Sequence, residues 1–228
     1  AVAENWEEFR RTLSRSLGLV FLLTIPSSAG LVLVGKAMIG AVYQGGKFDS
    51  YDTQQTAMAL SCFAIGLAGY SALKVLSPAF YALKDSRTPM LVSLGSVIVN
   101  YALARTMVDV LQLGHAGLAV STSGIALFSA VTLFLLMRRK IGGLYGRMLW
   151  SSLSKTVLAT AVMAAVVWFL EGWIAWMPFI AQLAIAIPVG AIVFFLAARA
   201  FGLEELAMAT DAMAGPLKRR LPFLRGKL

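Results

Sequence analysis

The chain has 228 residues, of which 59% are hydrophobic and only 14% are charged, and its mean hydropathy is +0.78. Soluble domains carry about 25% charged residues, so this composition excludes an ordinary soluble protein. The apolar residues form continuous blocks rather than the short alternating segments of a membrane barrel. The composition therefore predicts an all-α, polytopic membrane helix bundle.

Six apolar blocks predict six transmembrane helices. Their predicted bounds are residues 17–34 (continuing as helix to 43), 56–81, 90–110, 117–137, 153–170 and 179–201. Each block is close to the roughly 20 residues that a helix needs to cross a bilayer. Residues 1–16 have the pattern of an amphipathic helix that leads into the first span, and we expect the chain to be a piece of a longer protein.

Most of the basic residues fall on one side of this topology. Fifteen of the 20 Lys and Arg residues do so, namely Arg10, Arg11, Arg15, Lys84, Arg87, Arg138, Arg139, Lys140, Arg147, Lys155, Lys218, Arg219, Arg220, Arg225 and Lys227. Only Lys47 lies clearly in a loop on the other side. The positive-inside rule then places both ends of the chain in the cytoplasm. The same asymmetry explains the net charge of +9, with the lipid bilayer as partner and no need for nucleic acid.

One lysine is predicted inside a span. Lys74 lies about 10 Å before the cytoplasmic end of the second span, at 1.5 Å per residue. Its ammonium group can snorkel to the membrane surface or face a polar cavity within the protein. The sequence leaves both alternatives open.

Other polar residues cluster in the third and fourth spans. Arg105 and Asp109 are four residues apart, so they share a helix face and can form a local ion pair. Asn100 lies near the middle of the third span, where an amide can bridge helices or ligate a small cation. The run "STS", residues 121–123, offers hydroxyl groups and is more typical of helix packing than of a site.

The segment between the second and third spans has a local explanation. Asp85 and Ser86 suit a turn, and we expect Thr88 to be the N-cap of the third span with Pro89 at its first helical position. The tryptophans at 150, 168, 173 and 176 are predicted to anchor the chain at the membrane interfaces. No phosphate-binding loop, zinc-binding cluster or Ser-His-Asp set is present, so no enzyme is predicted.

Several motifs together resemble one known family. In order they read "AVYQGGKF", "TAMAL", "KVLSPAFYALKDSRTPM", "GHAGLAVSTS" and "LLMRRKIGG". They resemble the bacterial MurJ/MviN lipid II flippases, and "KVLSPAFYALKDSRTPM" is the most specific of them. The resemblance covers nearly the whole chain and is weakest over about the last 60 residues, where it is mostly hydropathy.

The resemblance implies an architecture. Members of the family have fourteen transmembrane helices, and this chain is similar to the ninth to fourteenth. It would then be the C-terminal part of a two-lobe transporter of the MOP-superfamily type, with the N-terminal lobe as partner. Residues 1–140 would supply four helices of the transport lobe, residues 141–217 two groove-forming helices, and residues 218–228 a basic cytoplasmic tail.

The resemblance also implies an activity and a site. The family moves undecaprenyl-diphosphate-linked peptidoglycan precursor across the bacterial inner membrane by alternating access, and Lys74 matches the family's lysine before V-L-x-P. Asn100 and Thr122 match two ligands of a sodium site proposed for some members. The carboxylate of that site is replaced by Ala104 here, so that site is incomplete in this chain. Coupling to sodium and coupling to the membrane potential both stay open, and no other cofactor is expected.

Two other functions remain compatible with the sequence. The first is a related exporter of drugs or of another lipid-linked oligosaccharide. The second is a membrane scaffold for envelope synthesis that transports nothing. Arginines in the cavity of the N-terminal lobe would favour a lipid II headgroup, with its diphosphate, over the substrates of the related exporter. The short basic tail without a soluble domain disfavours the scaffold.

Overall fold

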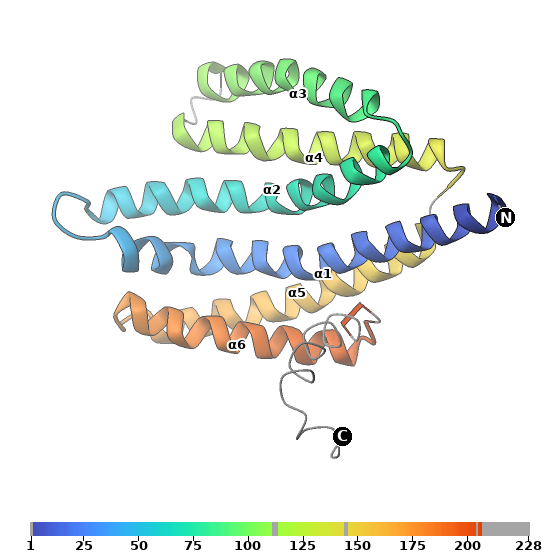
Figure 1. Ribbon diagram of the computed structural model, residues 1–228. Helices are drawn as coiled ribbons and strands as arrows, with labels where there is room; N and C mark the ends of the chain where they lie inside the picture. Colours follow the sequence, from blue (N-terminus) through green and yellow to red (C-terminus); the bar gives the residue numbers. More distant parts are fainter. Residues whose placement is uncertain (1, 111–113, 144–145, 204, 207–228) are drawn as a thin grey trace, which may run out of the picture.

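The computed structural model describes residues 2–110, 114–143, 146–203 and 205–206. Over these residues the chain forms long helices joined by short turns (Figure 1). The elements are α1 (Val2–Tyr43), α2 (Ser50–Ala82), α3 (Arg87–Arg105), a π-helical turn η1 (Thr106–Val110), α4 (Gly114–Lys140), α5 (Gly146–Ile174) and α6 (Phe179–Ala200). The basic tail predicted at residues 218–228 lies outside the described residues.

Six of these helices are long and apolar enough to cross a membrane, which confirms the predicted all-α bundle of six spans. Most helices extend beyond their apolar blocks, because polar residues continue the helix past the hydrocarbon boundary. The third span differs from its prediction in the type of its last turn. Its α-helix ends at Arg105, and the chain continues to Val110 as a π-helical turn.

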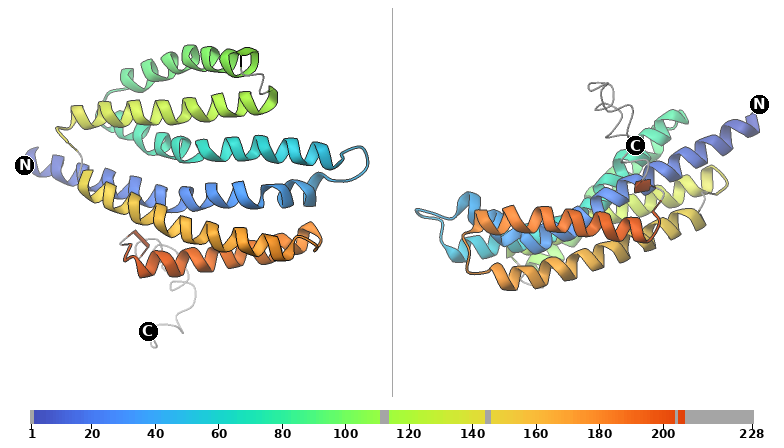
Figure 2. Two further views of the ribbon diagram at one scale, coloured as in Figure 1. Left: turned by 180° about the vertical axis from the view of Figure 1, so that it is seen from behind. Right: turned by 90° about the horizontal axis from the view of Figure 1, so that it is seen from below.

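The helices lie side by side in a layer rather than around a common axis. Figure 1 shows the order α3, α4, α2, α1, with α5 and α6 next to α1, and the view from behind in Figure 2 shows the same order. The close neighbours are α3 with α4, α4 with α2, α2 with α1, α1 with both α5 and α6, and α5 with α6. The buried core is shared among α1, α2, α4 and α5.

The largest hydrophobic cluster joins α1, α2, α4 and the start of α5. It includes Leu17 of α1, Leu76 and Phe80 of α2, Met137 of α4 and Leu149 of α5. A second cluster joins α1 to α5 and α6 farther along the bundle. The first cluster fixes the helix ends that carry most of the basic loop residues.

Basic residues gather at one end of the layer. The start of α1, the α2–α3 turn and the end of α4 meet there (Figure 1). The described basic residues at this end include Arg10, Arg11, Arg15, Lys84, Arg87, Arg138, Arg139 and Lys140. We call it the basic end. The α1–α2 loop, which carries Lys47, lies at the opposite end.

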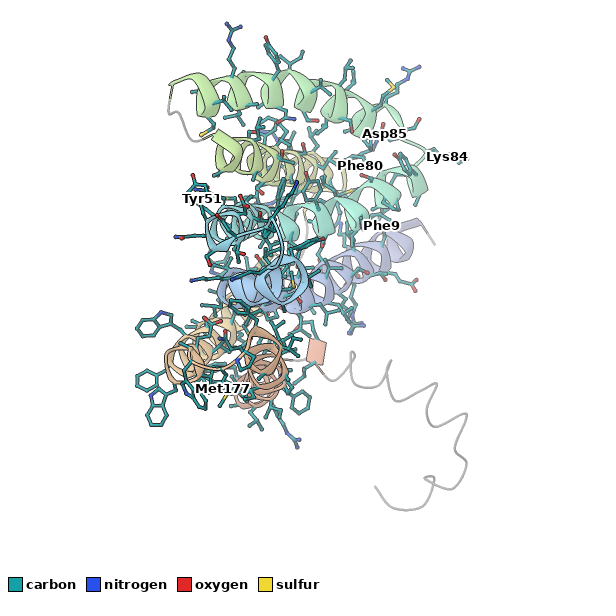
Figure 3. The ribbon with its side chains drawn as sticks, turned by 90° about the vertical axis from the view of Figure 1, so that its left-hand side faces the viewer. Phe9, Tyr51, Phe80, Lys84, Asp85 and Met177 are labelled. Atoms are coloured by element: carbon teal, nitrogen blue, oxygen red, sulfur yellow. The ribbon has the colours of Figure 1, made fainter. Side chains whose placement is uncertain are left out.

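The turn between α2 and α3 is built around a backbone cap. Lys84 adopts the left-handed conformation with φ of 58°, and the Asp85 N–H donates to the carbonyl of Phe80 at 3.0 Å. This is the hydrogen-bond pattern that ends helices at a left-handed residue, usually glycine. It stops α2 sharply and turns the chain toward α3, as Figure 3 shows around Phe80, Lys84 and Asp85.

The N-cap position of α3 is Ser86, and the side chain of Asp85, rather than that of Thr88, caps the helix. The Asp85 carboxylate accepts the Thr88 N–H at 3.1 Å and the Thr88 hydroxyl at 2.7 Å, and it also pairs with Lys140 at the end of α4. The predicted N-cap at Thr88 is therefore wrong, because α3 begins at Arg87. The hydrogen bond from Lys140, with those from Thr88, holds the pKa of the Asp85 carboxyl well below its usual range. The carboxylate stays ionised at neutral pH and ties the α2–α3 turn to α4.

Candidate functional site

Lys74 lies on the face of α2 that points away from the core. It is exposed, and so are Tyr70, Pro78 and Tyr81, which follow the same face of the helix at intervals of three or four residues. The opposite face of α2 carries the buried residues Ala72 and Leu76. The structure thus presents Lys74 among aromatic side chains on an open face of the layer.

The depth of Lys74 in the bundle can be measured from the end of α2. That helix ends at Ala82, eight residues after Lys74, so the Lys74 backbone lies about 12 Å from the end of the helix. This depth is compatible with snorkelling, and the exposed face is compatible with a cavity shared with another part of the protein. Which of the two holds stays a prediction.

The predicted sodium ligands are on neighbouring helices but do not form a complete ion site. The Asn100 Oδ1 atom is buried without a hydrogen-bond partner, and the Thr122 hydroxyl donates to the Leu118 carbonyl of its own helix at 2.8 Å. Ala104 supplies no carboxylate. In the described part of the chain, no group of three or more His, Cys, Asp and Glu side chains could hold a metal. Asn100 and Thr122 therefore lie on adjacent helices without the carboxylate of that site, and a sodium site there stays a prediction.

The predicted ion pair of Arg105 with Asp109 is not decided by the structure. Arg105 is exposed, and its Nη1 donates to the Tyr101 hydroxyl at 3.5 Å. The Asp109 side chain lies outside the described residues. The regular spacing that would place the two side chains on one face ends at Arg105, because Thr106–Val110 is π-helical.

Small residues join α2 to α4 at a very close contact, which the sequence reasoning missed. A Cβ atom on Gly66 would lie 2.7 Å from Ser123 Cα, and one on Gly69 would lie 2.7 Å from the backbone carbon of Ala126. The Ser123 hydroxyl donates to the Cys62 carbonyl at 2.6 Å across this contact. We call Gly66, Gly69, Ser123 and Ala126 the α2–α4 seam. Its signal in the sequence is that Gly66 and Gly69 are three residues apart, so that two residues without side chains share one face of α2.

An apolar groove opens on the other side of α2 from Lys74. It has a volume of about 460 Å³ and is lined by α1, α2, α4 and the start of α5, with Ala72, Leu127 and Val131 among its walls. Arg138 and Trp150 line it at the basic end of the bundle. The resemblance implies a groove formed by the last two helices, within residues 141–217. That groove stays a prediction.

The family comparison decides what kind of protein carries these features. The sequence profile of the family described as "Lipid II flippase MurJ" matches residues 1–187 of this chain. The chain belongs to the MurJ lipid II flippase family. The predicted family is therefore confirmed, and it is a family of transporters rather than enzymes.

Individual relatives that carry the name MurJ support the same family assignment. A probable lipid II flippase MurJ of Rickettsia prowazekii is 35% identical over 113 residues, which are 50% of this chain and 22% of the relative. A lipid II flippase MurJ of Burkholderia cenocepacia is 33% identical over 138 residues, which are 60% of this chain and 26% of the relative. The chain spans between 22% and 32% of the length of such MurJ relatives.

A solved structure shares the fold. It is a lipid II flippase MurJ in an inward closed conformation, with a TM-score of 0.71 and 23% sequence identity. The match covers 88% of this chain and 40% of that MurJ chain. The layer of helices described here is thus the fold of part of a MurJ transporter.

Proposed function

We propose that the protein containing this chain is a lipid II flippase and that the chain supplies the C-terminal six helices of it. The family match over residues 1–187 carries this proposal. The substrate would be the lipid-linked peptidoglycan precursor, and the part of the transporter outside this chain, including the N-terminal lobe, would complete its cavity. The chain covers too little of its relatives to perform that transport alone.

The open face of α2 supports a role in holding the headgroup. A diphosphate cannot cross hydrocarbon without a polar path, and a lysine ammonium is a compact point charge suited to phosphate oxygens. Lys74 and its exposed neighbours Tyr70 and Tyr81 lie on a face that the described part of the chain leaves uncovered. We assign Lys74 to headgroup binding when this face lines the cavity.

The α2–α4 seam and the Asp85–Lys140 pair support movement as a rigid body. The seam holds two helices in direct backbone contact, and the ion pair joins the α2–α3 turn to the end of α4. Alternating access by rocking of one lobe against the other requires a lobe that moves without deforming. For energy coupling, the incomplete ion site at Asn100 and Thr122 favours the membrane potential over sodium.

We further propose that the basic end faces the cytoplasm of a bacterial inner membrane, following the positive-inside rule. A cysteine in place of Lys47, in a background with Cys62→Ser, is then expected to react with a membrane-impermeant maleimide in intact cells. A cysteine in place of Arg139 is expected to react only after the membrane is permeabilised. Both residues are exposed, so access depends on the side of the membrane. The reversed pattern would contradict the orientation.

Growth rescue tests the proposed function. The full-length protein is expected to sustain growth of bacteria depleted of their own lipid II flippase, whereas residues 1–228 expressed alone are not, because one lobe cannot enclose a cavity. Membrane extracts probed by immunoblot check that both proteins are inserted. Rescue by residues 1–228 alone would overturn the two-lobe account.

A further inference from the structure

The groove between α1, α2, α4 and α5 has the dimensions of half a bilayer. On α4 its lining runs from Arg138 at the basic end to Leu127, eleven residues earlier, which is about 16 Å of helix. The hydrocarbon core of a bilayer is about 30 Å thick. The groove therefore extends through about one leaflet, beginning at the membrane surface of the basic end.

The wall and the mouth of the groove differ in chemistry. Its wall is made of aliphatic, aromatic and small side chains, among them Ala72, Leu127 and Val131. At the mouth, Arg138 is exposed and Trp150 is 73% exposed. Tryptophan favours the headgroup level of a membrane, and arginine binds phosphate through paired N–H donors.

Among the basic side chains that the structure describes in this region, Arg138 is the one that lines the groove. Lys140, two residues later, is paired with Asp85 and lies 5.9 Å from the centre of the Phe80 ring. Arg10 approaches the turn after α4, where its Nη2 atom would lie 3.0 Å from a Cβ atom on Gly142. The exposed Arg139 is not among the groove's lining residues. An anion bound at the mouth would meet the Arg138 guanidinium.

We infer that this groove holds one acyl chain of an anionic phospholipid, with the lipid phosphate against Arg138. Basic pockets between transmembrane helices are suited to anionic headgroups, and an apolar groove one leaflet deep matches a phospholipid chain. An undecaprenyl chain is much longer than one leaflet is deep, which argues against the transported lipid as occupant. The inference is independent of the proposed function, because Lys74 lies on the opposite face of α2.

Lipid binding to the purified full-length protein tests whether the positive charge of Arg138 holds the lipid phosphate. Native mass spectrometry is performed with added phosphatidylglycerol and, separately, with zwitterionic phosphatidylcholine. Arg138→Gln is expected to weaken phosphatidylglycerol binding about tenfold, since the loss of a hydrogen bond between two charged groups costs about that factor. Arg139→Gln is the matched control, with the same charge change one residue away, and is expected to change binding less than about twofold. Equal losses in the two variants would show attraction by diffuse surface charge and overturn the site.

Filling the groove with a larger side chain tests whether an acyl chain occupies it. Val131 lines the groove and is 56% exposed, whereas Leu135 on the same helix is 47% exposed and does not line it. Val131→Trp is expected to remove specific phosphatidylglycerol binding, and Leu135→Trp to retain it, with thermal unfolding confirming that both variants fold. Unchanged binding by Val131→Trp would overturn the proposal and indicate that another part of the protein fills the groove. Displacement of phosphatidylglycerol by an equal concentration of undecaprenyl phosphate would assign the groove to the transported lipid instead and equally overturn it.

Discussion

Replacing Lys74 with alanine is expected to slow lipid II translocation by about tenfold or more while leaving membrane insertion unchanged. The lysine is exposed on the face of α2 opposite the buried residues Ala72 and Leu76, so its removal is expected to leave the core intact. A hydrogen bond to a charged group contributes about 1.5–3 kcal/mol, and each 1.4 kcal/mol is about a factor of ten. The measurement is the rate at which purified full-length protein in lipid vesicles moves labelled lipid II between leaflets.

Two further variants separate headgroup binding from snorkelling. Lys74→Arg keeps the positive charge and is expected to retain most of the activity. Lys36→Ala removes an exposed lysine from α1 and is expected to leave transport unchanged. If Lys74→Ala transports as fast as the wild type, Lys74 only anchors α2 at the membrane surface, and its assignment to the headgroup is wrong.

Replacing Gly69 with alanine is expected to destabilise the protein by about 1–3 kcal/mol, the usual cost of overpacking a tight interior. The new Cβ would lie 2.7 Å from the Ala126 backbone carbon and 2.8 Å from the Leu127 nitrogen. Backbone atoms cannot rotate away as a side-chain end can, so α2 and α4 must separate. The free energy of unfolding of the full-length protein in detergent measures this effect, and slower transport is expected to accompany it.

Gly30→Ala is the matched control for the seam. Gly30 is also inside a helix, but a Cβ atom there would meet no other atom within 4 Å. Alanine favours helix over glycine by about 1 kcal/mol, so this variant is expected to be as stable as the wild type or more so. Equal destabilisation by both substitutions would mean that the seam contact is not specific.

Hydropathy predicted the number and order of the spans because a helix in lipid must hide its backbone within about 20 apolar residues. It could not predict where helices continue into water, and it missed the π-helical turn after Arg105. The exchange of Thr88 for Asp85 as the cap of α3 has a similar cause. Both residues are good caps, and hydropathy does not show that the Asp85 carboxylate accepts from Thr88 and also pairs with Lys140, which is 55 residues away along the chain.

The candidate site was partly visible in the sequence. Lys74 could be identified because an ionisable residue inside a span is costly. The α2–α4 seam escaped notice because Gly66 and Gly69 are two of 20 glycines, and their role depends on which helix lies opposite. The groove was equally hidden, since Arg138 and Ala72 meet only when α2 and α4 pack together.

The central claim is that the protein containing this chain moves lipid II across a membrane, and transport by the purified protein tests it most directly. Vesicles that contain the full-length protein and fluorescent lipid II in both leaflets are treated with a reagent that quenches only the outer one. Flipping is expected to expose nearly all of the labelled lipid to the reagent with time. If about half of the fluorescence stays protected, as in protein-free vesicles, the protein does not move lipid II and the account is wrong.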